Sequence, residues 1–378
     1  MKCRSATLVP DRLAYGGLAP LPIASPMGGE KCIRLHLSES MIGPSPRARA
    51  ALHEQGRRAG RYPDATAGSL IAAIADMHQV QPAAVVVGNG IDELLLFTAL
   101  AFVGAGGAGI FCAQTFPGHR SALEVVRGAP REVPLSANRI DAERLADEMR
   151  SGASAAYVCN PHNPTGSALS AEELAFLVDQ ACETGTLLVV DEAYMEYAEP
   201  DLATSAIDYV RQGAPVVVLR TFSKIFGLAG LRCGYSIAPE PYSSHLRKLK
   251  HVTVFNVNRL ALAAAEASIR DRDFVAYVRG ETRRALRSFL GDIGALAWLR
   301  PMPSVTNFVL LGTPWAATDV AAVLRRRGIL VRPCADLGFP LHVRLSMGAP
   351  AHLSAAVLGL AAASQDLRHA DGAVDRWV

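Results

Sequence analysis

A lysine flanked by hydroxyl groups and followed by an arginine is the part of this chain best suited to chemistry. Lys224 follows Thr221 and Ser223, just past the apolar run 216–219, and Arg232 comes eight residues later. The run predicts a buried strand, which places the lysine beyond a strand end. A lysine amine forms a Schiff base with an aldehyde, and hydroxyls with a guanidinium bind phosphate. Pyridoxal 5′-phosphate (PLP) needs both a Schiff-base partner for its aldehyde and donors for its phosphate. We therefore predict a PLP site here, with an ordinary basic surface loop as the alternative.

Two further strand ends carry groups suited to the ring of the same cofactor. Asp191 follows the apolar run 187–190, and a carboxylate there can keep a pyridine nitrogen protonated through a charge-assisted hydrogen bond. Tyr194, three residues later, can reach the phenolic oxygen of the ring. Asn163 lies in the turn 160–166, whose two X-Pro steps hold it rigid and can aim its amide at that same oxygen. Read singly, the aspartate would be a helix cap and the asparagine part of a plain turn.

A glycine turn supplies the remaining cofactor contacts. The segment 88–93 reads as the end of a strand, a turn and the start of a helix, with Gly90, Ile91 and Asp92 at the junction. Backbone N–H groups at a helix N-terminus bind phosphate. An ordinary strand-to-helix loop is the alternative. We therefore predict Lys224, Asp191 and Tyr194 as the catalytic residues.

These motifs, in this order, resemble the fold-type I PLP enzymes, the class I/II aminotransferases, over residues 37–348. Within that superfamily the chain is most similar to the histidinol-phosphate aminotransferase group, through the blocks 37–46, 61–64 and 255–258. The resemblance implies an α/β fold, with a large domain built on a mostly parallel sheet and a smaller α+β domain. It implies transamination of an amino acid or amino-alcohol phosphate, with 2-oxoglutarate and glutamate as the amino partner pair.

The resemblance also assigns roles beyond the cofactor ring. It implies that Arg344 binds the acidic group of a small amino substrate, and that Arg332 assists when that group is a phosphate. It implies that Tyr62 reaches the cofactor of a neighbouring subunit, so we expect a homodimer.

Two departures from the family pattern leave the substrate open. His119 occupies the position at which we expect a family tyrosine to stack on the pyridine ring, and an imidazole there either stacks or carries protons. Ser38 and Ser40 replace two asparagines of the family block. The alternative function is therefore a non-transaminating PLP reaction, a decarboxylation, elimination or cyclisation in specialised metabolism.

Composition limits the other function classes. The chain has 378 residues, half of them hydrophobic, and a net charge of +3, too small to argue for nucleic acid. It has no apolar stretch of the roughly 18 residues that span a membrane. Seven cysteines form no C-x-x-C pair, and no histidine has metal-ligand spacing, so we expect a cytoplasmic, reduced protein without a metal.

Short apolar runs alternate with helical patterns along the chain, as in α/β proteins. We predict an N-terminal arm over 1–45, a PLP-binding domain over 46–260 and a C-terminal domain over 261–378. Ser170 and Glu173 have the spacing of a capping box. The glycine-rich segment 104–109 matches a dinucleotide fingerprint, but it precedes a strand rather than a helix, so we expect a connection only.

Overall fold

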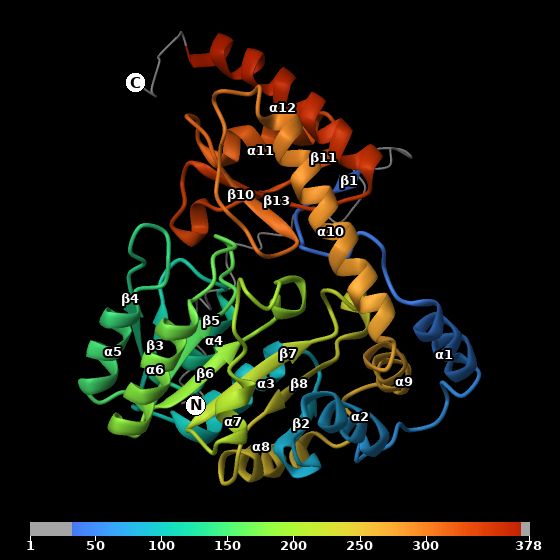
Figure 1. Ribbon diagram of the computed structural model, residues 1–378, viewed down its shortest axis with the longest axis vertical. Helices are drawn as coiled ribbons and strands as arrows, with labels where there is room; N and C mark the ends of the chain where they lie inside the picture. Colours follow the sequence, from blue (N-terminus) through green and yellow to red (C-terminus); the bar gives the residue numbers. More distant parts are fainter. Residues whose placement is uncertain (1–31, 372–378) are drawn as a thin grey trace, which may run out of the picture.

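The computed structural model describes residues 32–371, and a seven-stranded sheet forms its centre (Figure 1). The strand order is β2-β8-β7-β6-β5-β3-β4, and only β8 runs against its neighbours, β2 and β7. The central strands are buried along their whole length because they consist of apolar residues covered on both faces, as parallel sheets require. The strands are β2 (Val85–Gly88), β3 (Ala108–Cys112), β4 (Ala129–Val133), β5 (Ala155–Cys159), β6 (Leu187–Asp191), β7 (Val216–Thr221) and β8 (Gly234–Ile237).

Helices cover both faces of this sheet. They are α1 (Pro46–Gly56), α2 (Gly68–His78), α3 (Ile91–Phe102), α4 (Gly118–Val125), α5 (Ala142–Arg150), α6 (Ala171–Thr184), α7 (Ile207–Arg211), α8 (Tyr242–Lys250) and α9 (Arg259–Ile269). The predicted capping box is confirmed at the start of α6, where Ser170 and Glu173 each accept the other's backbone N–H. The glycine-rich segment 104–109 connects α3 to β3, so it does not open a helix.

A smaller antiparallel sheet, ordered β12-β13-β10-β9, lies at one end of the molecule (Figure 1). Its strands are β9 (Arg300–Pro301), β10 (Phe308–Gly312), β12 (Arg332–Pro333) and β13 (His342–Ser346), and its helices are α10 (Arg272–Ile293), α11 (Ala317–Arg326) and α12 (Pro350–Asp371). The N-terminal strand β1 (Ile33–Arg34) pairs in parallel with β11 (Ile329–Leu330) beside this sheet. Short 3₁₀ helices complete the chain: η2 (Pro82–Ala84), η3 (Met195–Tyr197), η4 (Ala229–Leu231), η5 (His251–Thr253) and η6 (Ala335–Leu337).

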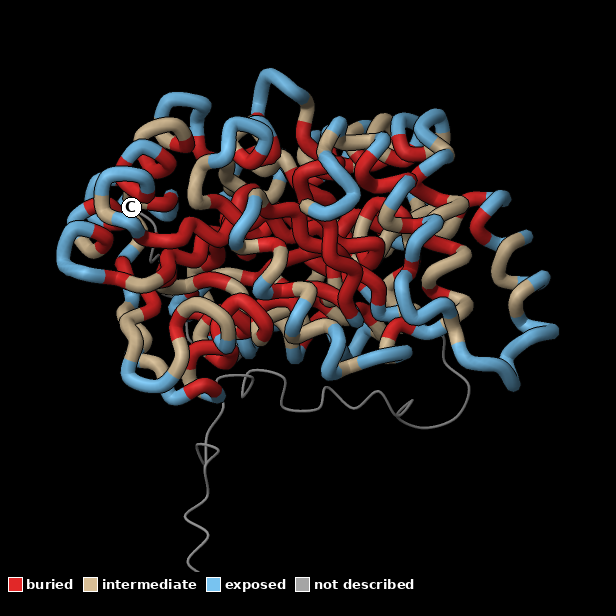
Figure 2. The backbone as a smooth tube through the Cα atoms, turned by 90° about the horizontal axis from the view of Figure 1, so that it is seen from below, coloured by how far each residue is buried: buried red, intermediate tan, exposed pale blue. Residues whose placement is uncertain are grey.

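The long helix α10 contributes residues to both main hydrophobic cores, that of the large sheet and that of the small sheet. Val275 and Val278 belong to the core of the large sheet, whereas Leu286, about two to three turns later, belongs to the small-sheet core. The helix α9, which the sequence assigned to the C-terminal domain, packs in the large core instead. Leu35 packs in the small core, so this part of the predicted arm belongs with the small sheet; positions 1–31 lie outside the described residues. Figure 2 shows the buried backbone gathered in the interior of the molecule, with exposed segments around it. Within the described range no helix has both the length and the apolar character to cross a membrane.

Candidate active site

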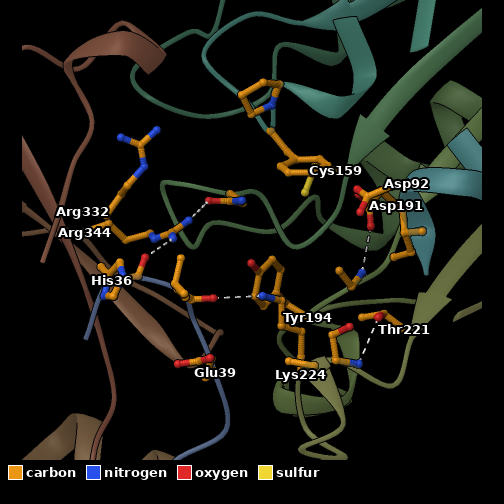
Figure 3. Close-up of a pocket in the computed structure, with 18 of the residues that line it drawn as sticks. His36, Glu39, Asp92, Cys159, Asp191, Tyr194, Thr221, Lys224, Arg332 and Arg344 are labelled. Carbon is orange, nitrogen blue, oxygen red and sulfur yellow. Dashed lines mark hydrogen bonds between the residues drawn. The ribbon is translucent and has the colours of Figure 1, made fainter. Parts of the chain in front are cut away.

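A cavity of about 450 Å³ lies between the large sheet and the small sheet (Figure 3). Cys159, Asp191 and Thr221, the last residues of β5, β6 and β7, line it from the large sheet. The carboxyl ends of parallel strands meet at one edge of a sheet, and ligands bind there. From the other side the cavity is lined by residues of the N-terminal segment and the small sheet, namely His36, Leu37, Glu39, Arg332, Leu337 and Arg344.

The three predicted catalytic residues converge on this cavity. Lys224 follows β7, and its Nζ donates to the Leu37 carbonyl at 3.2 Å and lies 5.4 Å from the centre of the Tyr194 ring. Asp191 ends β6 and is 3% exposed. Its Oδ1 accepts the backbone N–H of Ala193 at 3.1 Å, which fixes the carboxylate in the cavity wall. An amine and a buried carboxylate therefore face one space, as the sequence predicted.

The predicted phosphate contacts surround the N-terminus of α3. Gly90 precedes the helix with φ +83°, and a Cβ there would lie 2.6 Å from Arg232 Nη2, so only glycine leaves room for the guanidinium. Arg232 donates to Ser223 Oγ at 3.2 Å and pairs with Asp92 at 2.9 Å. Thr221 Oγ1 accepts the backbone N–H of Ser223 at 3.0 Å. Backbone N–H groups at a helix N-terminus, hydroxyls and a guanidinium are together a set that suits a phosphate.

His119 does not lie where the sequence placed it. The ring is fully buried and does not line the cavity; its Nε2 lies 3.3 Å from Asp191 Oδ2, and an ionised carboxylate accepts, so the imidazole donates. Phe116, three residues earlier, lines the cavity instead. The Phe116 ring packs on Gly118, where α4 begins, and a Cβ at that glycine would lie 2.3 Å from the ring. The aromatic ring forms the wall, and the imidazole is buried outside it. The stacking interpretation of His119 is thereby corrected, and its position gives a proton-shuttle role on the substrate no support.

The two predicted substrate arginines both line the cavity, from β12 and β13. Arg344 is 7% exposed, donates to Asn163 Oδ1 and donates to the His36 carbonyl at 2.9 Å. Arg332 pairs with Asp336 at 2.6 Å. Asn163 lines the cavity and uses its amide oxygen for Arg344, so its amide N–H₂ is the end left for another partner.

Tyr62 lies apart from these residues. Its side chain is 79% exposed and does not line the cavity within one chain. The ring stacks on Phe255, with the ring centres 4.8 Å apart, and Val252 beside Phe255 in sequence is also strongly exposed. Tyr62 and Phe255 therefore form an exposed pair of rings outside the cavity.

Other buried titratable groups near the cavity take no part in the chemistry. Burial and the neighbouring Asp191 raise the pKa of the Cys159 thiol well above its usual value, so the thiol stays protonated and is no nucleophile. Burial lowers the pKa of His162 to about 3, so that ring is neutral. Among the described residues no group of three histidine, cysteine or acidic side chains is placed to hold a metal ion.

Phe116, His36 and Glu39 are among the cavity residues that sequence reasoning did not single out. Phe116 lies three residues before His119, in the same segment before α4. Glu39 lies inside a block already matched to the family, and His36 just before it.

The donor set fits PLP: a lysine amine, a buried carboxylate, a flat aromatic wall and a phosphate cradle that a Cβ at Gly90 would fill. A mostly parallel α/β sheet with this site at its carboxyl edge, joined to a smaller antiparallel layer, defines a PLP-dependent enzyme of fold-type I. The Aminotransferase class I and II family model matches residues 30–360, and the chain belongs to that family. The protein is therefore a PLP-dependent aminotransferase.

Curated relatives and solved structures agree with this assignment. The chain is 34% identical over 322 residues to histidinol-phosphate aminotransferase 2 of Carboxydothermus hydrogenoformans, covering 84% of this chain and 87% of the relative. It is 34% identical to the histidinol-phosphate aminotransferase of Brevibacillus brevis, covering 85% and 87%. The histidinol-phosphate aminotransferase of Sinorhizobium meliloti, solved in complex with pyridoxal-5′-phosphate, superposes with a TM-score of 0.80 at 29% identity, covering 92% of this chain and 98% of that one. These likenesses confirm the predicted fold class and cofactor.

Proposed function

We propose that this aminotransferase transfers the amino group of histidinol phosphate, or of a closely related amino-alcohol phosphate or amino acid, to 2-oxoglutarate. The observation that carries the proposal is one cavity that holds a lysine amine at one end and the guanidinium groups of Arg344 and Arg332 at the other. The amine serves the reacting end of a substrate, and the guanidinium groups serve an anion at its far end. The names of the curated relatives support the choice of histidinol phosphate.

Bound PLP supplies the electron sink that lets the substrate's α-carbon lose a proton. Lys224 would hold the cofactor covalently and, with its amine free, would carry that proton from the substrate's α-carbon to C4′ of the cofactor. Asp191 would accept a hydrogen bond from the ring nitrogen and keep it protonated, and His119 orients Asp191 from behind. Asn163 and Tyr194 would hold the phenolic oxygen of the ring.

The remaining contacts hold the two anionic groups. The backbone N–H groups of Ile91 and Asp92, with Ser223, Arg232 and Thr221, would hold the cofactor phosphate. Phe116 takes over the ring-covering role first given to His119.

We further propose that the protein acts as a homodimer in which Tyr62 completes the neighbouring cofactor site, because its exposed ring does not line the cavity described in its own chain. A cytoplasmic location suits the cysteines that the structure describes, which are free thiols.

A single-turnover experiment tests the reaction type. PLP-loaded enzyme is mixed with histidinol phosphate, then separately with glutamate, and the cofactor spectrum is followed. Conversion to pyridoxamine phosphate, reversed by 2-oxoglutarate, is the expected result with both donors. Release of carbon dioxide, or loss of water or phosphate, with the cofactor spectrum retained would assign the alternative, non-transaminating class. Conversion by glutamate alone would keep transamination but reject the proposed substrate.

A further inference from the structure

His36 is held rigidly in the cavity wall by the backbone on either side of it. The Leu35 N–H donates to the Leu330 carbonyl and the Leu35 carbonyl accepts from the Ser346 N–H, each at 2.9 Å. The His36 carbonyl accepts Arg344 Nη2 at the same distance. The ring is 6% exposed and lines the cavity beside the substrate arginines (Figure 3). The backbone that carries the ring is therefore held in place before any ligand binds.

The state of this imidazole follows from its surroundings. Burial, and then the charges of Arg34, Arg344 and Arg332, lower the pKa of His36 to about 4, so the ring is neutral at physiological pH. Its Nδ1 is buried and meets no hydrogen-bond partner among the described residues. A proton on Nδ1 would be a buried donor without an acceptor, which is costly, so the favoured tautomer carries its proton on Nε2. Nε2 is the nitrogen left for the cavity.

The number of donors at this end of the cavity distinguishes two kinds of anion. A carboxylate has two oxygens, which one guanidinium satisfies in a bidentate pair. A phosphate monoester presents three acceptor oxygens. Arg344 and Arg332 each already use part of their donors on protein groups. Arg344 donates to Asn163 and the His36 carbonyl, and Arg332 to Asp336 and the Pro333 carbonyl. A further neutral donor beside them favours the anion with more acceptors.

We propose that His36 is a specificity-determining residue that donates a hydrogen bond from Nε2 to the phosphate of a phosphorylated amino substrate. This inference deepens the proposed function and rests on it for the placement of the substrate's anionic end at Arg344 and Arg332. It assigns to His36 the preference for a tetrahedral phosphate over a planar carboxylate.

The direct test is to measure anion binding to the purified, PLP-loaded protein. Inorganic phosphate and acetate are titrated by calorimetry into wild type, His36→Leu and His36→Gln, with His342→Leu as the matched control, since His342 lies on β13 but does not line the cavity. His36→Leu should weaken phosphate binding by roughly 10- to 100-fold, the effect of one hydrogen bond to a charged group, and change acetate binding less than about threefold. His36→Gln, which keeps an N–H donor, should recover part of the loss, and His342→Leu should bind both anions like wild type.

Kinetics provide the second readout. With histidinol phosphate, His36→Leu should raise KM at nearly unchanged kcat, because the contact is made equally in ground and transition states. KM for glutamate should stay the same, because glutamate has no phosphate for His36 to bind. Equal losses for phosphate and acetate, or none for either, would overturn the role of His36. If wild type binds phosphate through His36 but does not turn over histidinol phosphate, the proposed substrate fails and the anion preference stands. If wild type prefers acetate, the inference fails whatever the reaction.

Discussion

At the scale of single residues, the site depends on how Asp191 is held. Its two carboxylate oxygens have separate donors, the Ala193 backbone on one side and the His119 ring on the other. A carboxylate fixed from two sides cannot turn away from a ring nitrogen, and the buried surroundings strengthen each hydrogen bond. His119 is therefore a positioning residue, although no part of it touches the cavity.

Lys224→Ala should lose at least about 10³-fold in kcat, because the variant lacks both the covalent anchor and the proton carrier. Lys224→Arg is the control, since it keeps the positive charge but forms no imine. Borohydride reduction followed by peptide mapping should find PLP attached at position 224 of wild type only. Labelling of another lysine would show that the assignment is wrong.

His119→Phe should keep the ring volume and remove the hydrogen bond to Asp191. We expect kcat/KM to fall roughly 10- to 100-fold, as for the loss of one hydrogen bond to a charged group. Cofactor affinity should be less affected, whereas Phe116→Ala should weaken PLP binding, because Phe116 is the residue at the cavity wall. Wild-type turnover in His119→Phe would refute the positioning role.

At the scale of elements, a buried ion-pair network ties together the ends of β6 and β7. Arg220 donates from Nε to Glu192 at 2.8 Å and from Nη1 to Glu196 at 2.7 Å, and all three side chains are almost fully buried. Glu192 directly follows Asp191, and Arg220 directly precedes Thr221. The network therefore fixes two strand ends that each carry a cofactor residue.

Arg220→Met should destabilise the protein by about 3–5 kcal/mol, because it leaves two buried carboxylates without their charge partner. The control Arg284→Met removes an exposed pair with Glu281 on α10 and should cost less than about 1 kcal/mol. Urea unfolding of both variants measures the difference. Equal stability of the two variants would mean that the buried network contributes no more than a surface pair.

At the scale of the whole molecule, the cavity has walls from the two sheets. Asp191 ends β6 and Lys224 follows β7 of the large sheet, whereas Arg332 and Arg344 lie on β12 and β13 of the small sheet. The exposed ring of Tyr62 adds a third source of residues if two copies associate.

Sedimentation should find a dimer, and Tyr62→Ala should weaken PLP binding roughly tenfold through loss of one hydrogen bond to the neighbouring cofactor phosphate. Tyr277→Ala, which removes another exposed tyrosine on α10, is the control and should bind PLP normally. A fully active monomer, or equal effects of the two substitutions, would contradict the shared site.

The sequence by itself determined the cofactor chemistry and the fold class, because both depend on local signals. Apolar runs predict buried strands, and the residue after such a run lies at the sheet edge where ligands bind, so Asp191, Lys224 and the glycine turn before α3 could be placed without coordinates. The capping box of α6 was equally readable, since both of its hydrogen bonds span only three residues.

Only the tertiary structure decided which side chains share a wall. His119 and Phe116 are three residues apart, and only the fold shows that Phe116 lines the cavity while His119 is buried against Asp191. His36 gains its role from Arg344, 308 residues away, and α9 joins the large core because of what it packs against. Such contacts are made between distant segments, and no local propensity encodes them. The physical reason is that spacing along a strand or helix sets the direction in which each side chain points. The burial, the charged neighbours and the hydrogen-bond partners of that side chain are set by the elements that pack against it.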